Sequence, residues 1–131
     1  MTEDMIALGK RATACKGWRW MAGMKIANGI RVTESLIPFT FSVDVPDITD
    51  PATLGCLLAL VREVYGDPAL YVRLSDTTRQ SDGVRAWEVL GWLDPAHSPD
   101  GHGGSWRGWG FASEAEALVA SLELVASLEK T

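Results

Sequence analysis

Residues 50–66, DPATLGCLLALVREVYG, have the sequence of a short amphipathic helix with a defined start and end. Asp50 is a preferred N-cap residue, and Pro51 suits the first helical position because an N–H there has no partner in any case. Gly66 is expected to end the helix in the left-handed conformation. The apolar residues form one broad stripe: Leu54, Leu57, Leu58, Val61, Val64 and Tyr65. A stripe this wide requires cover, and we expect a β-sheet to pack against it.

The N-terminal third of the chain predicts one helix and one hairpin. Thr2 is expected to cap a helix that continues to Gly17, with apolar residues at helical spacing. Asn28-Gly29, within KIANGIRV, is the strongest hairpin signal, since both residues tolerate the positive φ of a type I′ turn. Residues 37–45 are expected to be extended, and two prolines confine them to a sheet edge or an irregular run.

The C-terminal half predicts three strands and a closing helix. Residues 70–74 alternate, with Tyr71 and Arg73 pointing outward, and residues 84–93 and 105–111 are the other two strand candidates. Trp87 and Trp92 must face opposite sides of the second strand, which indicates cover on both faces of the sheet. Polar turns are expected at 76–83 and at 94–105, the latter rich in proline and glycine.

The closing helix, 117–128, follows a capping box formed by Ser113 and Glu116, and its apolar face contains Leu118, Leu122 and Val125. The order of elements predicts an α+β fold. We expect an antiparallel sheet, made of an N-terminal hairpin and a C-terminal three-stranded meander, packed by about three helices. A length of 131 residues indicates a single domain over residues 1–131.

Composition and the N-terminal sequence indicate a globular protein of the cytoplasm. Hydrophobic residues make up 47% of the chain and charged residues 22%. No apolar run approaches the roughly 20 residues of a membrane span, and MTEDMIALGK has acids where a signal peptide would be basic. Cys15 and Cys56 are expected to be reduced thiols in the core.

The net charge of −5 is unevenly distributed. Residues 1–31 contain six basic and two acidic side chains, a net of +4, whereas residues 32–131 contain six basic and fifteen acidic side chains, a net of −9. An acidic protein is a poor ligand for duplex nucleic acid, which requires several neutralising contacts. A local basic patch beside acidic surface is compatible with a small anionic ligand or a basic protein partner.

The sequence contains no signature of a catalytic, metal or cofactor site. Gly101-His102-Gly103-Gly104 lacks the lysine of a phosphate-binding loop, and Ser105 lacks the flanking glycines of a nucleophile elbow. Zinc would use paired ligands, but Cys15, Cys56, His97 and His102 show no such spacing. A Cys56–His97 nucleophile pair is disfavoured because Cys56 lies beside the apolar helix stripe. We therefore predict a non-enzyme without catalytic residues, metal or cofactor.

Two clusters combine flat aromatic rings with cations, as nucleotide-binding surfaces do. In both, the alternative is a purely structural role, with the tryptophans filling the core and the glycines serving turn geometry. Convergence of the two clusters in space would favour ligand binding over the structural role of both. The first cluster consists of Lys16, Trp18, Arg19, Trp20 and Lys25. The second consists of His97, His102, Trp106, Arg107 and Trp109 around a glycine-rich loop.

Three stretches carry a family resemblance: ALGKRATACKGWRWMAGM, PDITDPATLGCLLALVREVYGDP and GWGFASEAEALVASLELVASLE. They resemble small proteins encoded by bacteriophages and prophages, and the second half is similar to the phage ABA-sandwich family. This resemblance covers most of residues 6–70 and 105–128 and implies a sandwich of helices about a sheet, in the cytoplasm of a host cell. It carries over no catalytic residue. ALGKRATACKGW followed by WMAGM is also similar to the opening of phage proteins that sequester cyclic-nucleotide immune signals.

These observations lead to two hypotheses from different classes. The first is a non-enzymatic phage protein that counteracts host defence by binding a small nucleotide-type signal, in which case a homo-oligomer is expected. The second is an acidic inhibitor of a host defence complex, similar in action to an anti-CRISPR protein, whose carboxylates mimic phosphates. A virion or assembly accessory is a third alternative. The second hypothesis uses four acids: Asp76, Asp82, Glu88 and Asp94.

Overall fold

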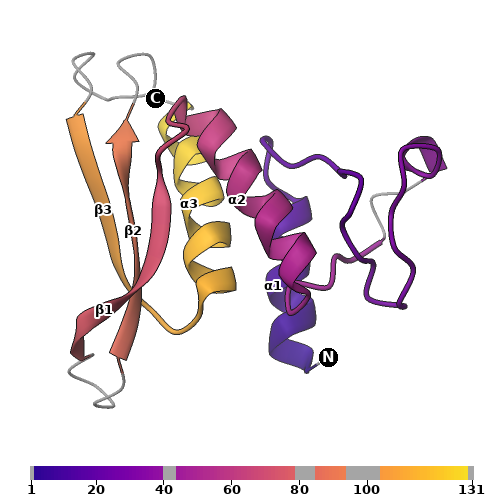
Figure 1. Ribbon diagram of the computed structural model, residues 1–131, viewed down its shortest axis with the longest axis horizontal. Helices are drawn as coiled ribbons and strands as arrows, with labels where there is room; N and C mark the ends of the chain where they lie inside the picture. The colour runs from indigo at the N-terminus through magenta and orange to yellow at the C-terminus, as the bar shows by residue number, and fades with distance from the viewer. Residues whose placement is uncertain (1, 40–43, 79–84, 94–103, 130–131) are drawn as a thin grey trace.

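The computed structural model describes residues 2–39, 44–78, 85–93 and 104–129. Three strands form one antiparallel sheet in the order β1-β2-β3, as the predicted meander requires. With three helices, the architecture is α+β, which confirms the predicted fold class. The elements follow the order α1 (Glu3–Thr13), η1 (Ile37–Phe39), α2 (Pro51–Tyr65), β1 (Tyr71–Thr78), β2 (Arg85–Leu93), β3 (Gly104–Phe111) and α3 (Glu114–Glu129) (Figure 1).

The central element of this architecture is α3, which lies between the sheet and the other two helices (Figure 1). It contacts all three strands on one side and α1 and α2 on the other. The expectation that a sheet covers the helix at 50–66 is therefore wrong, because α3 provides that cover. The cause lies in the sequence of α3, whose apolar residues surround the helix, and such a helix becomes an inner layer. The buried apolar residues of α3 are Ala115, Ala117, Leu118, Val119 and Leu122.

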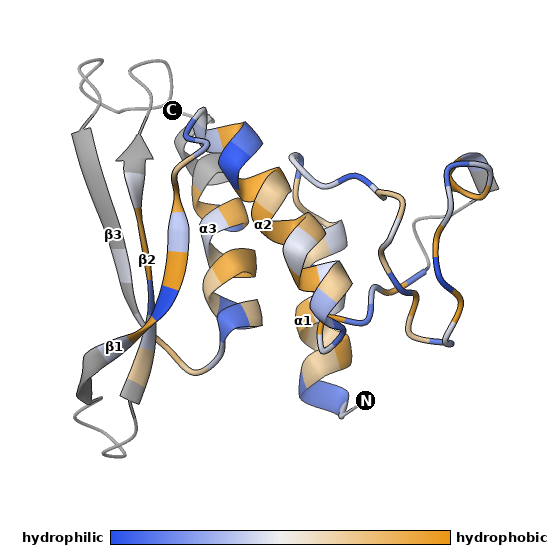
Figure 2. Ribbon diagram, viewed as in Figure 1, coloured by the Kyte–Doolittle hydropathy of each residue, from blue (hydrophilic) through white to orange (hydrophobic). Residues whose placement is uncertain are grey.

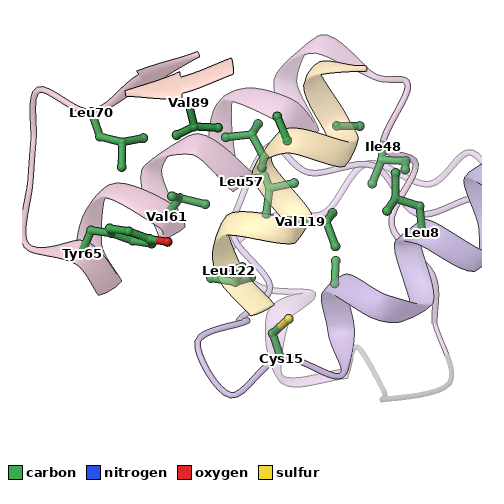
Figure 3. Packing of buried hydrophobic residues seen from close by; sticks show 14 residues of the cluster. Leu8, Cys15, Ile48, Leu57, Val61, Tyr65, Leu70, Val89, Val119 and Leu122 are labelled. Atoms are coloured by element: carbon green, nitrogen blue, oxygen red, sulfur yellow. The ribbon is translucent and has the colours of Figure 1, made fainter. Parts of the chain in front are cut away.

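The main core forms where the three helices meet the inner face of the sheet (Figure 3). Leu57, Val61 and Tyr65 of α2 are fully buried against α3. The Tyr65 hydroxyl donates a hydrogen bond of 2.9 Å to the Ser121 carbonyl oxygen and so joins the two helices. The sheet contributes Val89, together with Leu70 just before β1.

Both ends of α2 are as predicted. The Asp50 carboxylate accepts a 3.0 Å hydrogen bond from Thr53 N, and Gly66 ends the helix at φ 68°. Leu60 was not on the predicted stripe, yet it is fully buried in a second core cluster with Met24 and Val32. The segment before α2 covers this side of the helix, so α2 is buried on two sides.

The first helix is shorter than expected. It is capped by Thr2, as predicted, but ends at Thr13 rather than Gly17. Gly17 instead marks a close approach to α2, since a Cβ at this position would lie 2.7 Å from Val64 Cγ1. The chain therefore leaves the helix early and packs across α2.

Residues 25–39 and 44–47 form a projection that we call the arm (Figure 1). The hairpin lies at the predicted place, where Ile26 N donates to Ile30 O and Gly29 N donates to Ile26 O, each at 2.8 Å. Among the described residues only glycines have positive φ, so Asn28 does not, and the predicted type I′ turn is wrong. Gly29, at φ 101°, is the residue of this loop that adopts a positive φ.

The arm does not join the sheet, so the predicted N-terminal contribution to the sheet is also wrong. Its pairing consists of two isolated bridges, Lys25 with Arg31 and Ile26 with Pro46. Residues 37–39 form a 3-10 turn rather than an extended segment, a conformation that the fixed φ of Pro38 permits. The rest of the extended prediction includes residues 40–43, which lie outside the described residues.

The strands agree with the prediction except at the end of β1, which extends through Asp76 to Thr78 where a turn was expected. Residues 79–84 and 94–103 of the two expected turns lie outside the described residues. All three helices lie on one side of the sheet, so no described helix provides the expected cover on the other face (Figure 1). Trp87 packs against the main core, whereas the side chains of Trp92 and Val125 lie outside the described part. None of the described helices has the length and apolarity to cross a membrane.

Candidate ligand-binding surfaces

The tryptophans of the first predicted cluster pack into the protein. Trp18 is half-buried and contacts both core clusters, while Trp20 packs on the second cluster. Their rings meet edge to face, with centroids 5.3 Å apart and planes at 85°. The buried Nε1 of Trp18 has no hydrogen-bond partner among the described residues. This arrangement corresponds to the structural alternative, in which the two rings fill space beside α2.

The three cations of the first cluster lie in different settings. Arg19 forms an ion pair with Glu63 of α2, with Nη1 2.5 Å from Oε2. Lys16 is exposed. The backbone of Lys25 is fixed by two hydrogen bonds: its N–H donates to Thr53 Oγ1 at 2.8 Å, and its carbonyl accepts from Asp47 N at 2.7 Å. A phosphate near Arg19 would therefore meet the carboxylate of Glu63.

Arg31 connects the arm to the start of α2. Its guanidinium binds both carboxylate oxygens of Asp50, at 2.5 and 3.1 Å, and also donates to the Gly23 carbonyl at 3.0 Å. The same carboxylate caps α2 through Thr53. The hydrogen bond from Arg31 is the main reason that the pKa of Asp50 is lowered to about 2.

The other arginines with described side chains also have partners within the chain. Arg11 binds both carboxylate oxygens of Glu123, and Arg62 Nε donates to the Leu70 carbonyl at 2.7 Å. Arg73 of β1 forms an ion pair with Glu88 of β2, with Nε 2.5 Å from Oε1. Glu88 is 1% exposed, so it is not a surface acid that could mimic a phosphate, contrary to expectation.

The second predicted cluster is divided between β3 and undescribed residues. Trp106, Arg107 and Trp109 lie on β3, at positions opposite Gly91, Leu90 and Glu88 of β2. His97 and His102 lie outside the described residues. β3 is an edge strand, and α3 lies between it and α2, on which Trp18 and Trp20 pack (Figure 1). The backbone thus keeps Trp106, Arg107 and Trp109 apart from the first cluster.

The strand register brings together a different set of residues on the sheet face opposite α3. Val72 and Val89 are paired and pack toward the core, so their neighbours Arg73 and Glu88 share the other face. Tyr71 lies on this outer face and is 42% exposed. The register positions of Arg107 and Trp109 belong to the same face. The sequence indicated only that Tyr71 and Arg73 point outward, because pairing across strands is not visible in it.

Neither cysteine resembles a reactive nucleophile. Cys15 is buried, as predicted, and burial raises its pKa to about 11. Cys56 is only half-buried, and its Sγ lies 3.7 Å from the Ala22 carbonyl oxygen; burial raises its pKa as well. Both thiols are therefore protonated at neutral pH. Across the described part of the chain, no group of three or more His, Cys, Asp and Glu side chains is placed to hold a metal.

Comparison with known proteins gives no further assignment. No family model matches this chain, and no curated protein or solved structure is significantly similar to it.

Proposed function

We propose that this is a non-enzymatic binding protein that counteracts host defence by docking on a basic protein surface, such as that of a nucleic-acid-binding complex. The observation that carries this proposal is the arm. It projects from the helical layers and exposes large apolar side chains, with Ile30 51% and Leu36 39% accessible (Figures 1 and 2). Exposed apolar side chains on a projecting segment are accessible to a protein partner.

Charge supports a basic partner. The arm contains Glu34, Asp44 and Asp47 against Lys25 and Arg31, and the positive charge of Arg31 is taken up by Asp50 outside the arm. The chain as a whole carries a net charge of −5. Electrostatic complementarity of this kind accelerates association with a positively charged surface and makes it sensitive to salt. The resemblance to phage proteins is the reason for proposing host defence as the process that the protein counteracts.

The proposal is tested by capture of a partner from a bacterial lysate at low salt, followed by identification of the captured protein. We expect a basic partner that is released as the salt concentration rises. The double variant Ile30→Ser with Leu36→Ser should reduce capture at least tenfold, whereas Leu124→Ser, which alters a similarly exposed apolar side chain on α3, should retain it. Equal capture by both variants would exclude the arm as the docking element.

A small nucleotide-type ligand is the second candidate, and the outer face of the sheet favours it. Exposed Tyr71 shares this face with the register positions of Arg107 and Trp109, while Arg73 on the same face is paired with Glu88. Aromatic residues and cations on an antiparallel sheet are suited to base stacking and phosphate contacts. This candidate retains Arg107 and Trp109 of the second predicted cluster and leaves out the first cluster, residues 16–25.

A thermal-shift panel of linear and cyclic nucleotides, with the mass in solution measured alongside, distinguishes the two candidates. A ligand at one hundred times its Kd stabilises by about 2.7 kcal/mol, a shift of several degrees. For the second candidate we expect a shift that Tyr71→Ala and Trp109→Ala abolish and Trp20→Phe retains. A panel without any shift would leave the protein partner as the remaining proposal.

A further inference from the structure

A surface hollow lies between α1 and the start of α3, outside the surfaces discussed above. It has a volume of about 370 Å³, within the range of small-molecule sites. Met5, Leu8 and Ala112 give it an apolar floor, and the carboxylates of Asp4 and Glu116 lie in its lining. The hollow therefore combines apolar surface with negative charge, on two helices that pack against each other.

The one cation that lines the hollow is already neutralised among the described residues. Arg11 binds Glu123 through two hydrogen bonds, Nε to Oε2 at 3.2 Å and Nη2 to Oε1 at 2.5 Å. It is thus not available to attract an anion, and Asp4 and Glu116 would repel one. The Arg11–Glu123 pair, at the side of the hollow, also shows how a guanidinium lies against α3 when both oxygens of one carboxylate hold it.

Glu116 is held in position by its role at the start of α3. Its Oε2 accepts a hydrogen bond from Ala112 N, and its own N–H donates to Ser113 Oγ, both at 3.1 Å. A carboxylate whose rotamer is fixed in this way loses little conformational entropy when a ligand binds. The apolar floor beside it suits the aliphatic stem of a long basic side chain, and the planar guanidinium matches a carboxylate better than an ammonium does.

We propose that this hollow receives an arginine side chain of the protein partner, with the stem on Met5 and Leu8 and the guanidinium between Asp4 and Glu116. This inference rests on the proposed function, since it assigns a residue type to the basic partner. It adds a second contact, on the helical layers, to the one made by the arm.

The test uses Nα-acetyl-arginine amide as the probe, titrated into the whole protein and followed by amide chemical shifts. We expect saturable shifts at Leu8 and Ala112. Glu116→Gln, which retains the hydrogen bond to Ala112 N, should weaken binding at least threefold. The matched control Glu114→Gln removes the same charge from the same turn of α3 but lies outside the lining of the hollow, and it should leave the affinity unchanged. Nα-acetyl-norleucine amide, which lacks the guanidinium, should produce no saturable shift.

Shifts that do not saturate would overturn the inference, as would equal weakening by Glu114→Gln and Glu116→Gln, which would indicate general electrostatic attraction. Partner capture distinguishes a failure of this inference from a failure of the proposed function. If the probe does not bind while the wild type still captures its partner, the hollow is excluded and the function stands. If the probe binds and no basic partner is captured, the proposed function fails and the site remains.

Discussion

Helices α2 and α3 have similar lengths, 15 and 16 residues, and both are rich in apolar residues, yet they occupy different layers (Figure 2). Around α2, Ala52, Gly55 and Ala59 remain exposed. In α3 the buried residues cover a wider arc of the helix than in α2, including Ser121, whose hydroxyl donates to the Ala117 carbonyl at 2.7 Å, while Glu123 and Leu124 lie on the face that is not buried. Clear caps and a clean stripe made α2 the more recognisable helix, but a wider apolar arc made α3 the central one. The layer of a helix follows from how many of its faces are apolar.

The largest effect is expected from truncating the inner helix. Leu118→Ala should lower the free energy of unfolding by about 2–5 kcal/mol, because it removes a fully buried side chain and leaves a cavity. Leu57→Ala in α2, also fully buried, should fall in the same range, whereas Leu58→Ala should lose less because Leu58 is only half-buried. Urea denaturation measures all three. A loss below about 1 kcal/mol for Leu118→Ala would contradict the central position of α3.

A smaller loss is expected where the two helices are joined by a hydrogen bond. Tyr65→Phe removes the donor to the Ser121 carbonyl while retaining the ring, and should cost about 1 kcal/mol. Tyr71→Phe, at an exposed tyrosine of β1, is the matched control and should be close to neutral. Equal effects of the two variants would mean that the link between α2 and α3 contributes nothing.

Alkaline pH should weaken the main core, which contains both Tyr65 and Cys15. Burial raises the pKa of Tyr65, and it raises that of Cys15 from 9.0 to about 11. A raised folded-state pKa means that the unfolded chain loses its proton first, so stability is complete below about pH 9 and declines as the pH rises to 11. Cys15→Ala should flatten this decline in denaturation curves measured between pH 8 and 11. An unchanged slope would show that the thiol is not the group responsible.

The smallest effects on stability are expected from two glycine substitutions, one on the exposed side of α2 and one in the segment that packs against this helix. Gly55 is exposed, and a Cβ there would meet nothing within 4 Å, so Gly55→Ala should stabilise by about 0.5–1 kcal/mol. Gly17→Ala should destabilise, because its Cβ would lie 2.7 Å from Val64 Cγ1 and 3.2 Å from Leu122 Cδ1. Thermal unfolding should move in opposite directions for the two variants. A shift of the same sign would contradict the close packing assigned to Gly17.

Local features of this fold were readable in the sequence because they depend on neighbouring residues. The N-cap Asp50, the C-terminal Gly66 and the capping box at Ser113 each involve contacts within four residues. The Glu116 carboxylate reaches Ala112 N, one residue before the expected partner. The early end of α1 and the burial of Leu60 depend on packing between distant segments, which periodicity does not report.

The candidate surfaces were less predictable for the same reason. Residue types in the first cluster suggested a cationic cradle, but Arg19 pairs with Glu63, 44 residues away. Arg73 and Glu88 come together only through the register of β1 and β2. The hollow between α1 and α3 joins Asp4 to Glu116, and no local pattern links the two. Each of these surfaces is a product of tertiary contacts.

The position of α3 has a consequence for how the chain folds during its synthesis. The partner of Arg11 lies 112 residues later in the chain. The apolar face of α2 is covered by α3, which follows all three strands. The core therefore cannot close one helix at a time as the ribosome releases the chain. Its formation depends on contacts between distant segments, which slow folding and leave apolar surface exposed until α3 has emerged.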